Sequence, residues 1–117
     1  MERCFLLILI TATGVFADSI EPKVKDDIIS KEGESVTLSC TYDTSSNNVM
    51  LYWYRQYLNR EPQFLLRKGA RSWSSSEDIP DRRFRATTSQ SSTEITIDSV
   101  TLSDSALYYC ALRVGAQ

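Results

Sequence analysis

The chain has 117 residues with 13 basic and 15 acidic side chains, a formal net charge of −2, and no histidine. This mild acidity gives no electrostatic footprint for nucleic acid or an anionic membrane surface. Without histidine the chain cannot build a Ser–His–Asp or Cys–His catalytic arrangement, or a histidine-ligated zinc site. We therefore expect no enzymatic activity, no cofactor and no metal.

Residues 1–17 have the layout of a secretory signal peptide. One basic residue precedes the apolar run "FLLILI", and "VFA" follows with small side chains where a signal peptidase reads. The run is too short to cross a bilayer of about 30 Å as a helix. A buried N-terminal helix is the alternative interpretation. Cleavage after Ala17 would leave one small domain that starts at residue 18.

Three cysteines are present, and Cys4 lies within the proposed signal peptide. Cys40 and Cys110 would then fold in an oxidising compartment, where disulfides persist. We expect these two to pair, which on the chain-entropy model is worth roughly 4 kcal/mol. The alternative is two free buried thiols.

Short strands follow in chain order, separated by turn-forming residues. "ESVTLSCTY" (34–42), "RFRATT" (83–88) and "TEITID" (93–98) alternate apolar and polar residues, which predicts strands with one buried face. "VMLYWYRQ" (49–56) and "ALYYCAL" (106–112) carry large side chains on both faces, so both faces should be covered. Polar segments lie between these runs, and no helical periodicity competes. The sequence predicts a single all-β sandwich.

Two cysteines with a tryptophan between them resemble the immunoglobulin signature. Trp53 follows Cys40, and Tyr108 stands two residues before Cys110. The resemblance implies a Greek-key sandwich in which the tryptophan packs on the disulfide and the tyrosine bonds back to the backbone. It also implies an ion pair between Asp104 and an arginine beside Phe84. Arg83 is the expected partner, with Arg82 as the alternative.

Longer motifs resemble one branch of this family. The stretch "FLLRKGARSW" resembles the two extra strands of a variable-type (V-type) domain. "WYRQ", "EPQFLL" and "DSALYYCAL" resemble a T-cell receptor alpha-chain variable region, from the pool shared by alpha and delta chains. The resemblance covers residues 18–112. Residues 113–117 would begin the third hypervariable loop of an unrearranged germline segment, or of a transcript cut before joining.

The family's last strand, strand G, has no counterpart in this pattern. We therefore expect residues 18–117 to leave an open sheet edge at the strand that contains Cys110. Apolar residues would flank that edge, namely Leu107, Tyr109 and Leu112. We also expect Asn59 to take the left-handed turn position that glycine often occupies.

The resemblance assigns one sheet face to a partner chain's variable domain. Five residues match the family's interface positions: Tyr54, Gln56, Pro62, Phe64 and Tyr109. Gln56 would exchange amide hydrogen bonds with a glutamine of the partner. A merely decorated sheet face is the alternative.

Loops at the end opposite Asp104 would bind the ligand. The candidate residues are Asp43, Ser45, Ser46, Asn47 and Asn48 in the first loop, Lys68, Arg71 and Trp73 in the second, and Arg113 in the third. Trp73 and Arg71 are the expected anchors, because rigid aromatic and guanidinium groups commonly anchor binding loops. The alternatives are that Trp73 packs under its own loop and that the basic residues are simply solvated.

The implied function is recognition of a peptide held by a major histocompatibility molecule, jointly with a beta chain. The chain would enter the secretory pathway and act at the extracellular face of the plasma membrane, held there by constant and transmembrane parts. An antibody light-chain variable domain is one alternative, and expression in B cells would favour it. A V-type co-receptor or adhesion domain is another, and a splice site after the last codons would favour it. A secreted enzyme is a remote third.

Overall fold

The computed structural model describes residues 3–9, 18–24 and 28–115. In this part of the chain, strands and one short 3-10 helix, η1, alternate with turns. The elements are β1 (Arg3–Leu9), β2 (Ser19–Pro22), β3 (Ile28–Lys31), β4 (Val36–Asp43), β5 (Asn48–Gln56), β6 (Gln63–Arg71), β7 (Glu77–Asp78), β8 (Phe84–Thr88), β9 (Ser92–Ile97), η1 (Leu102–Asp104) and β10 (Ala106–Val114).

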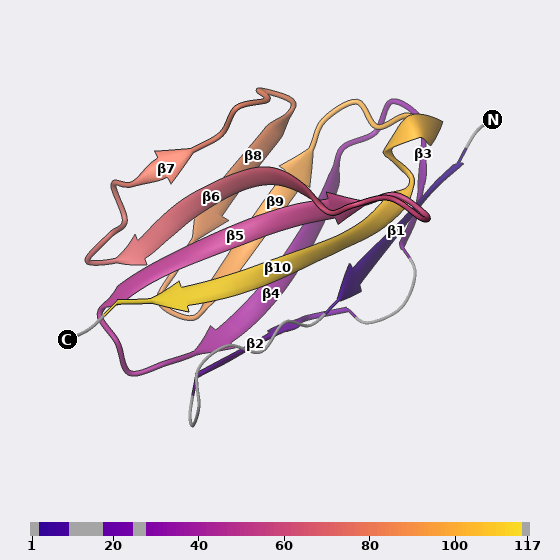
Figure 1. Cartoon of the computed structure of the whole chain (residues 1–117). Helices are drawn as coiled ribbons and strands as arrows, with labels where there is room; N and C mark the ends of the chain where they lie inside the picture. Colours follow the sequence, from indigo (N-terminus) through magenta and orange to yellow (C-terminus); the bar gives the residue numbers. More distant parts are fainter. Residues whose placement is uncertain (1–2, 10–17, 25–27, 116–117) are drawn as a thin grey trace.

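These strands form two sheets that pack face to face (Figure 1). The first sheet has the order β3-β1-β10-β5-β6-β7, and the second has β2-β4-β9-β8. Neighbouring strands run antiparallel, except that β1 and β10 pair in parallel. The predicted all-β sandwich is confirmed.

Alternating side chains of β4 and β9 fill the space between the sheets. Leu38 and Cys40 are buried, and they pair across the ladder with Ile95 and Thr93. On the opposite face of the same strands, Thr37 and Thr96 form a hydroxyl–hydroxyl hydrogen bond of 2.9 Å. The period of two read from the sequence therefore correctly predicts which face is buried.

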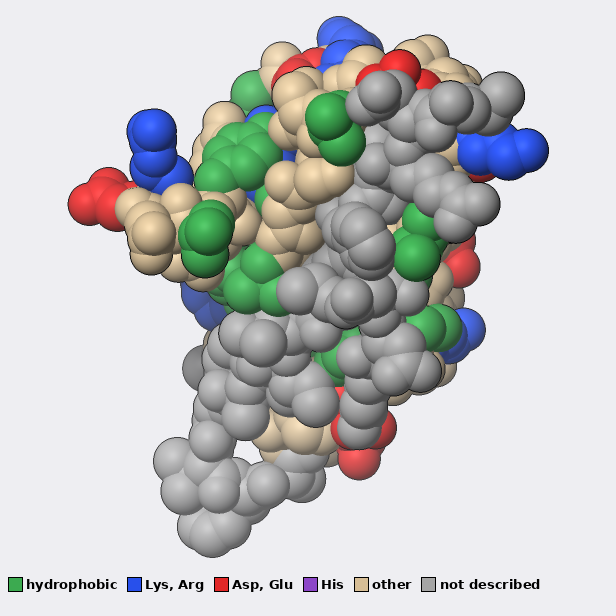
Figure 2. Space-filling view, turned by 90° about the vertical axis from the view of Figure 1, so that its right-hand side faces the viewer, with side chains coloured by type: hydrophobic (Ala, Val, Ile, Leu, Met, Phe, Trp, Pro, Cys, Tyr) green, Lys and Arg blue, Asp and Glu red, His purple; other side chains and the backbone are tan. Residues whose placement is uncertain are grey.

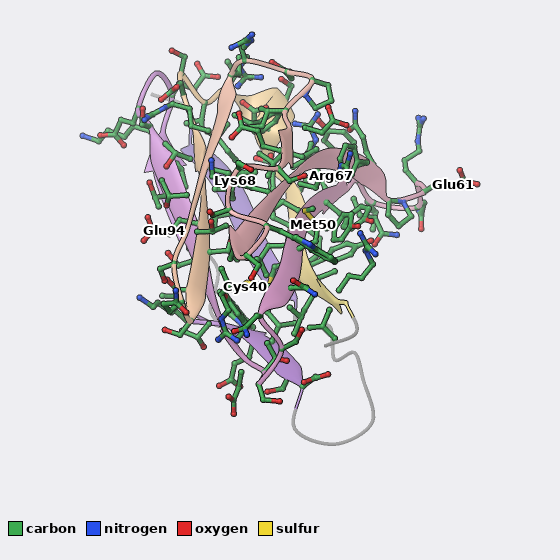
Figure 3. All side chains as sticks on the ribbon, turned by 90° about the vertical axis from the view of Figure 1, so that its left-hand side faces the viewer. Cys40, Met50, Glu61, Arg67, Lys68 and Glu94 are labelled. Atoms are coloured by element: carbon green, nitrogen blue, oxygen red, sulfur yellow. A yellow bond between two sulfur atoms is a disulfide. The ribbon has the colours of Figure 1, made fainter. Side chains whose placement is uncertain are left out.

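The core centres on the disulfide and the tryptophan. Cys40 and Cys110 are bonded, which confirms the predicted pairing. Figure 3 shows Cys40 between the sheets, whereas Glu61 projects outward from the turn between β5 and β6. The Trp53 indole is fully buried, and its Nε1 donates to Thr93 Oγ1 at 3.2 Å. A side-chain hydroxyl thus satisfies the one polar atom of this buried ring.

A register shift in β6 brings two consecutive leucines into the core. The pairing of β5 with β6 shifts between Trp53 and Tyr54, and Leu65 and Leu66 are both buried. In regular strand geometry, neighbouring side chains would point to opposite faces. The extra residue of a bulge breaks this alternation and bends the strand.

A tight polar corner closes the end of the sandwich near η1. Asp104 is 1% exposed, and its Oδ2 lies 2.6 Å from Arg83 Nη2, so Arg83 is the partner rather than Arg82. The Tyr108 hydroxyl donates to the backbone carbonyl of Asp104 at 2.7 Å. Arg55 of β5, which the sequence pattern does not single out, lies 3.3 Å from the same carboxylate. Strand β5, the turn before β8 and η1 therefore meet at one buried charge.

The turns at this end also expose apolar side chains. Leu58 is 88% exposed and Leu102 is 53% exposed. Figure 2 views this side of the molecule and shows hydrophobic side chains among charged and polar ones. Asn59, in the turn between β5 and β6, has φ of 58°, as predicted.

The edge of β10 is partly covered in the whole chain, so the expectation drawn for residues 18–117 alone stays a prediction. In the whole chain β1 pairs with β10 over Ala106–Tyr109 and with β3 on its other side. Backbone groups of an edge strand can pair with any extended segment within reach, which explains this arrangement. Leu112, expected beside that edge, has a buried side chain, because it shares the inward face with Cys110.

Three boundaries also differ from the sequence interpretation. The β6 strand continues to Arg71, so Lys68 lies in a strand and not in a loop. Glu77 and Asp78, which lie in one of the polar segments between the predicted strands, form β7 and pair with β6. The β10 strand extends to Val114, which pairs with Val49, so strand structure continues two residues past the expected end at residue 112.

Candidate recognition surface and partner-facing sheet

The outer face of the first sheet carries a patch of stacked aromatic rings. We define the outer aromatic patch as Tyr52, Tyr54, Phe64 and Tyr109. The Tyr54 and Tyr109 rings stack with centroids 5.4 Å apart, and Phe64 meets Tyr54 edge-on at 6.0 Å. These side chains come from β5, β6 and β10, three adjacent strands. Such a patch on an outer sheet face is typical of a protein–protein interface.

Tyr109 is half-buried even without a partner. Burial raises the pKa of its phenol above the ordinary value of 10.0, and the nearby Tyr54 phenol adds to the effect. The ring is therefore neutral at physiological pH, and it can be covered by another protein without the cost of desolvating a charge.

Two further interface candidates flank the patch. Gln56 is half-buried, and its Nε2 donates to the Arg60 carbonyl at 2.9 Å. An amide nitrogen has two hydrogens, so this contact fixes the side chain and leaves capacity for a second acceptor. Pro62 is exposed in the turn that precedes β6. The five predicted interface residues therefore share the first sheet and its adjoining turn.

At the opposite end from Asp104, the loops contact one another. Ser46 is 5% exposed, and its Oγ donates to the Gly115 carbonyl at 2.9 Å and accepts from the Asn48 amide at 3.1 Å. The Ser46 amide in turn donates to Thr44 Oγ1. Ser46 thus fixes the shape of the first loop and the start of the third.

Trp73 supports the third loop from the second. Its indole lies against Gly115, where an added Cβ would come within 2.7 Å of Cη2. The Arg113 guanidinium lies over the indole, with Cζ 5.4 Å from the ring centroid, and Arg113 Nε donates to the Tyr52 hydroxyl at 3.0 Å. Trp73 is therefore half-buried as a floor for the outgoing chain.

Arg71 and Lys68 make internal contacts. Arg71 donates to the backbone carbonyls of Thr44 and Ser46, both at 2.7 Å. Lys68 Nζ lies 2.7 Å from Glu77 Oε1, an ion pair that joins β6 to β7 and lowers the pKa of Glu77 below its usual value.

The remaining loop candidates face solvent. Asp43, Ser45, Asn47 and Arg113 are exposed, and Asn48 is half-buried. They lie on the segments that Ser46, Arg71 and Trp73 hold in place. The predicted ligand residues thus divide into an exposed set and a supporting set.

Sequence reasoning missed several supporting residues. Gly69 is one, because a Cβ there would come within 2.0 Å of the Trp73 carbonyl oxygen. Tyr42 is another, since its hydroxyl donates to the Ser89 carbonyl at 2.6 Å. Glycine near a loop could have suggested a close backbone approach, but nothing in the sequence indicates which loop Tyr42 reaches.

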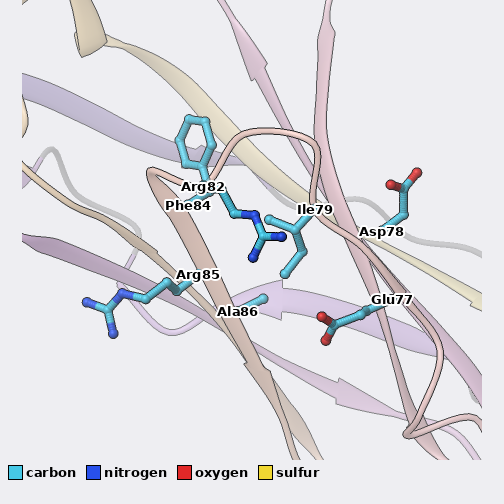
Figure 4. Close-up of a pocket in the computed structure, with 7 residues that line it drawn as sticks. All are labelled: Glu77, Asp78, Ile79, Arg82, Phe84, Arg85 and Ala86. Atoms are coloured by element: carbon cyan, nitrogen blue, oxygen red, sulfur yellow. The ribbon is translucent and has the colours of Figure 1, made fainter.

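A separate open hollow lies between β7 and β8, at the side of the sandwich. Its lining includes Glu77, Arg82 and Arg85 (Figure 4). Arg85 is paired with Asp98 at 2.8 Å, and Glu77 is paired with Lys68. These charges stabilise neighbouring strands, and the hollow does not adjoin the loops described above.

The described residues offer little for other classes of site. Within them, no group of three or more His, Cys, Asp or Glu side chains is placed to hold a metal ion. The same part of the chain contains no helix with the length and apolar character needed to cross a membrane.

Comparison with known proteins adds to this geometry. A family model described as "Immunoglobulin V-set domain" matches residues 23–117. Human T cell receptor alpha variable 18 is 40% identical over 110 residues, covering 92% of this chain and 93% of that protein. T-cell receptor alpha chain V region RL-5 of Oryctolagus cuniculus is 39% identical over 113 residues, covering 95% and 80%.

One solved structure shares the fold at lower identity. It is titled "Structural basis of T cell specificity and activation by the bacterial superantigen toxic shock syndrome toxin-1". A chain of it superposes with a TM-score of 0.62 at 20% identity, and the match covers 74% of each chain. At this identity the likeness shows the fold alone.

Proposed function

This chain belongs to the immunoglobulin V-set family and, within it, to the T-cell receptor alpha variable regions, and we propose that it recognises peptide held by a major histocompatibility molecule, together with a beta-chain variable domain. The function is binding without chemistry. The outer aromatic patch binds the beta chain. The loops at the end of the sandwich opposite Asp104, where β5 begins and β10 ends, bind the ligand.

The observation that carries the pairing proposal is the stacked pair Tyr54 and Tyr109, with Phe64 against it. Three rings on adjacent strands would bury a large apolar area against a second sheet of similar shape. Aromatic residues supply much of the binding energy at such contacts. Gln56, held by Arg60, adds a directional amide beside the rings.

The ligand proposal rests on the loop end. Its exposed set is Asp43, Ser45, Asn47 and Arg113. Short polar side chains and an arginine provide adaptable hydrogen bonds and one charged contact. Trp73 supports this exposed set from below, because it is half-buried beneath the third loop.

We also propose that residues 1–17 direct the chain into the secretory pathway and that the domain acts outside the plasma membrane. The Cys40–Cys110 disulfide supports this proposal, because such bonds persist in oxidising compartments.

Co-expression with a panel of T-cell receptor beta chains tests the pairing. Size-exclusion chromatography should yield a heterodimer, and Gln56→Glu should weaken it by placing a charge in the contact. Gln90→Glu is the matched control, since Gln90 is an exposed residue in the turn between β8 and β9 of the other sheet. Equal loss in both variants, or no heterodimer with any beta chain, would contradict the proposal.

Binding of the purified pair to a panel of peptide–histocompatibility complexes tests the ligand. Substitutions in the exposed set should weaken binding while pairing is unchanged. Binding that is indifferent to all of these substitutions would place the ligand elsewhere.

A further inference from the structure

The Arg71 guanidinium donates hydrogen bonds to three backbone carbonyls that belong to two separate loops. Its Nη1 donates to Thr44 and Ser46 in the first loop, each at 2.7 Å. Its Nε donates to the Gln90 carbonyl at 3.1 Å, and Nη2 donates to the same oxygen. Gln90 lies in the turn between β8 and β9, so one side chain joins the first loop to a turn of the opposite sheet.

The surroundings of Arg71 reinforce this bridge. Its Cζ lies 5.2 Å from the centroid of the Tyr42 ring, a distance suited to a cation–π contact. The Tyr42 hydroxyl donates to Ser89, and the Tyr42 amide donates to Ser91. The turn is therefore held from one side by Tyr42 and at its tip by Arg71.

Arg71 also adopts a backbone conformation that few side chains take. Its φ is 57°, in the left-handed region that costs energy for residues other than glycine. Directly after it, the Ser72 amide donates to the Asn47 carbonyl at 2.8 Å. The strained residue thus begins the second loop in contact with the first.

The chemistry of the three contacts requires arginine. A planar guanidinium presents five N–H donors in a fixed fork, whereas an ammonium group is a compact charge on a flexible stem. Among the described residues, no carboxylate forms an ion pair with Arg71. The hydrogen bonds that Arg71 donates in the described part go to backbone carbonyls. Arg71 therefore acts through the directions of its N–H donors and not through an ion pair.

We propose that Arg71 is a positioning residue that holds three segments together as one preformed unit. These segments are the first loop (43–48), the second loop that follows Arg71 (72–76) and the turn 89–92. We call this arrangement the lock. Arg71 acts on the ligand through these loops, without contact of its own. That last step rests on the proposed function, whereas the locking itself does not. A preformed unit loses less conformational freedom on binding, so the lock favours affinity.

Amide hydrogen exchange on the whole chain, followed by NMR, tests the lock. Arg71→Asn removes the guanidinium, and asparagine tolerates the left-handed backbone at this position. Arg71→Lys keeps the positive charge but lacks the planar set of donors. In both variants the amides of Ser46 and Ser92 should lose about tenfold or more of their protection, as expected for several lost hydrogen bonds. Amides in the paired core of β4 and β9 should keep theirs.

Arg67→Asn is the matched control, since Arg67 lies on the same strand and its guanidinium is 4.0 Å from Asp78, away from these loops. It should leave loop protection unchanged. The proposal is overturned if the loop amides keep their protection from exchange in either Arg71→Lys or Arg71→Asn. It is also overturned if the loop amides and the core amides lose protection equally. If Arg71→Asn fails to fold, Arg71→Lys alone decides. Neither ligand nor beta chain is present, so failure of the proposed function leaves this result intact.

Discussion

The Trp73 indole lies against Gly115, so the second loop forms the floor from which the third loop departs. A Cβ at position 115 would meet Cη2 at 2.7 Å and Cζ2 at 2.9 Å, distances that real contacts do not allow. The Gly115 amide donates to the Asn48 carbonyl at 2.9 Å, so the backbone there cannot easily retreat. Glycine is needed at this position for close approach, and not for its backbone freedom.

Gly115→Ala should therefore displace the Trp73 ring. We expect a change in tryptophan fluorescence and a loss of about 1 kcal/mol in unfolding free energy, typical of modest overpacking. Combining it with Trp73→Leu should relieve the clash, so the two effects should not add. Strict additivity in this double-mutant cycle would show that the indole is not what the methyl group meets.

Acid should weaken the fold through Asp104. Burial by itself raises the pKa of this carboxyl, but hydrogen bonds from Arg83 and the Thr101 amide, with the charges of Arg83 and Arg55, outweigh it and hold the pKa below 3.8. A depressed folded-state pKa adds stability above the unfolded value, and that stability is lost as pH falls through the folded value. Asp104→Asn should lower stability by about 2 kcal/mol at pH 7 and should flatten the loss below pH 4.

Denaturant unfolding at several pH values measures this effect. Asp98→Asn is a useful comparison, because hydrogen bonds from Arg85 and then Ser35 lower the pKa of Asp98 to about 2 at the protein surface. A surface ion pair contributes little, so the neutral-pH loss should be smaller there. Equal losses for both variants would mean that the buried corner is no stronger than a surface pair.

Removing residues 1–17 should open the edge of β10. In the whole chain β1 covers Ala106–Tyr109, and without it those backbone groups must turn to water or to another molecule. We expect residues 18–117, refolded with the disulfide, to aggregate more and to lose about 2 kcal/mol of stability. Appending a joining-type strand with Phe-Gly-x-Gly should restore both, and denaturant midpoints with monomer yields measure it.

Leu7→Pro in the whole chain separates edge pairing from chain length. Proline lacks the N–H that a paired strand donates, so this variant should behave like residues 18–117. If Leu7→Pro and residues 18–117 both unfold at the denaturant midpoint of the unsubstituted whole chain, the edge of β10 needs no covering strand.

Loss of the disulfide should be costly. Cys40→Ala with Cys110→Ala frees a loop with a sequence separation of 70, for which the chain-entropy model gives roughly 4 kcal/mol. The midpoint of denaturant unfolding should fall accordingly. The fluorescence of Trp53 should increase, because its indole no longer packs on the disulfide. An unchanged midpoint would mean that the packing of Trp53 against Thr93 suffices.

Local pattern was enough to predict the sandwich. Alternation along β4 and β9 indicated which side chains are buried, because successive residues of a strand point to opposite faces. By the same rule Tyr54 and Tyr109, each next in sequence to the buried Trp53 or Cys110, lie on the outer face. Asn59 was also predictable, since asparagine tolerates the left-handed turn that the chain requires there.

Contacts between distant segments were decided only by the tertiary structure. The sequence suggested Arg71 as a ligand anchor, yet its fork reaches Thr44, Ser46 and Gln90, which no local pattern connects. The path of β6 through its bulge and the left-handed turn at Arg71 determine where that side chain points. Strand periodicity says which face a residue occupies, whereas the partner across a loop depends on how several strands end together in space.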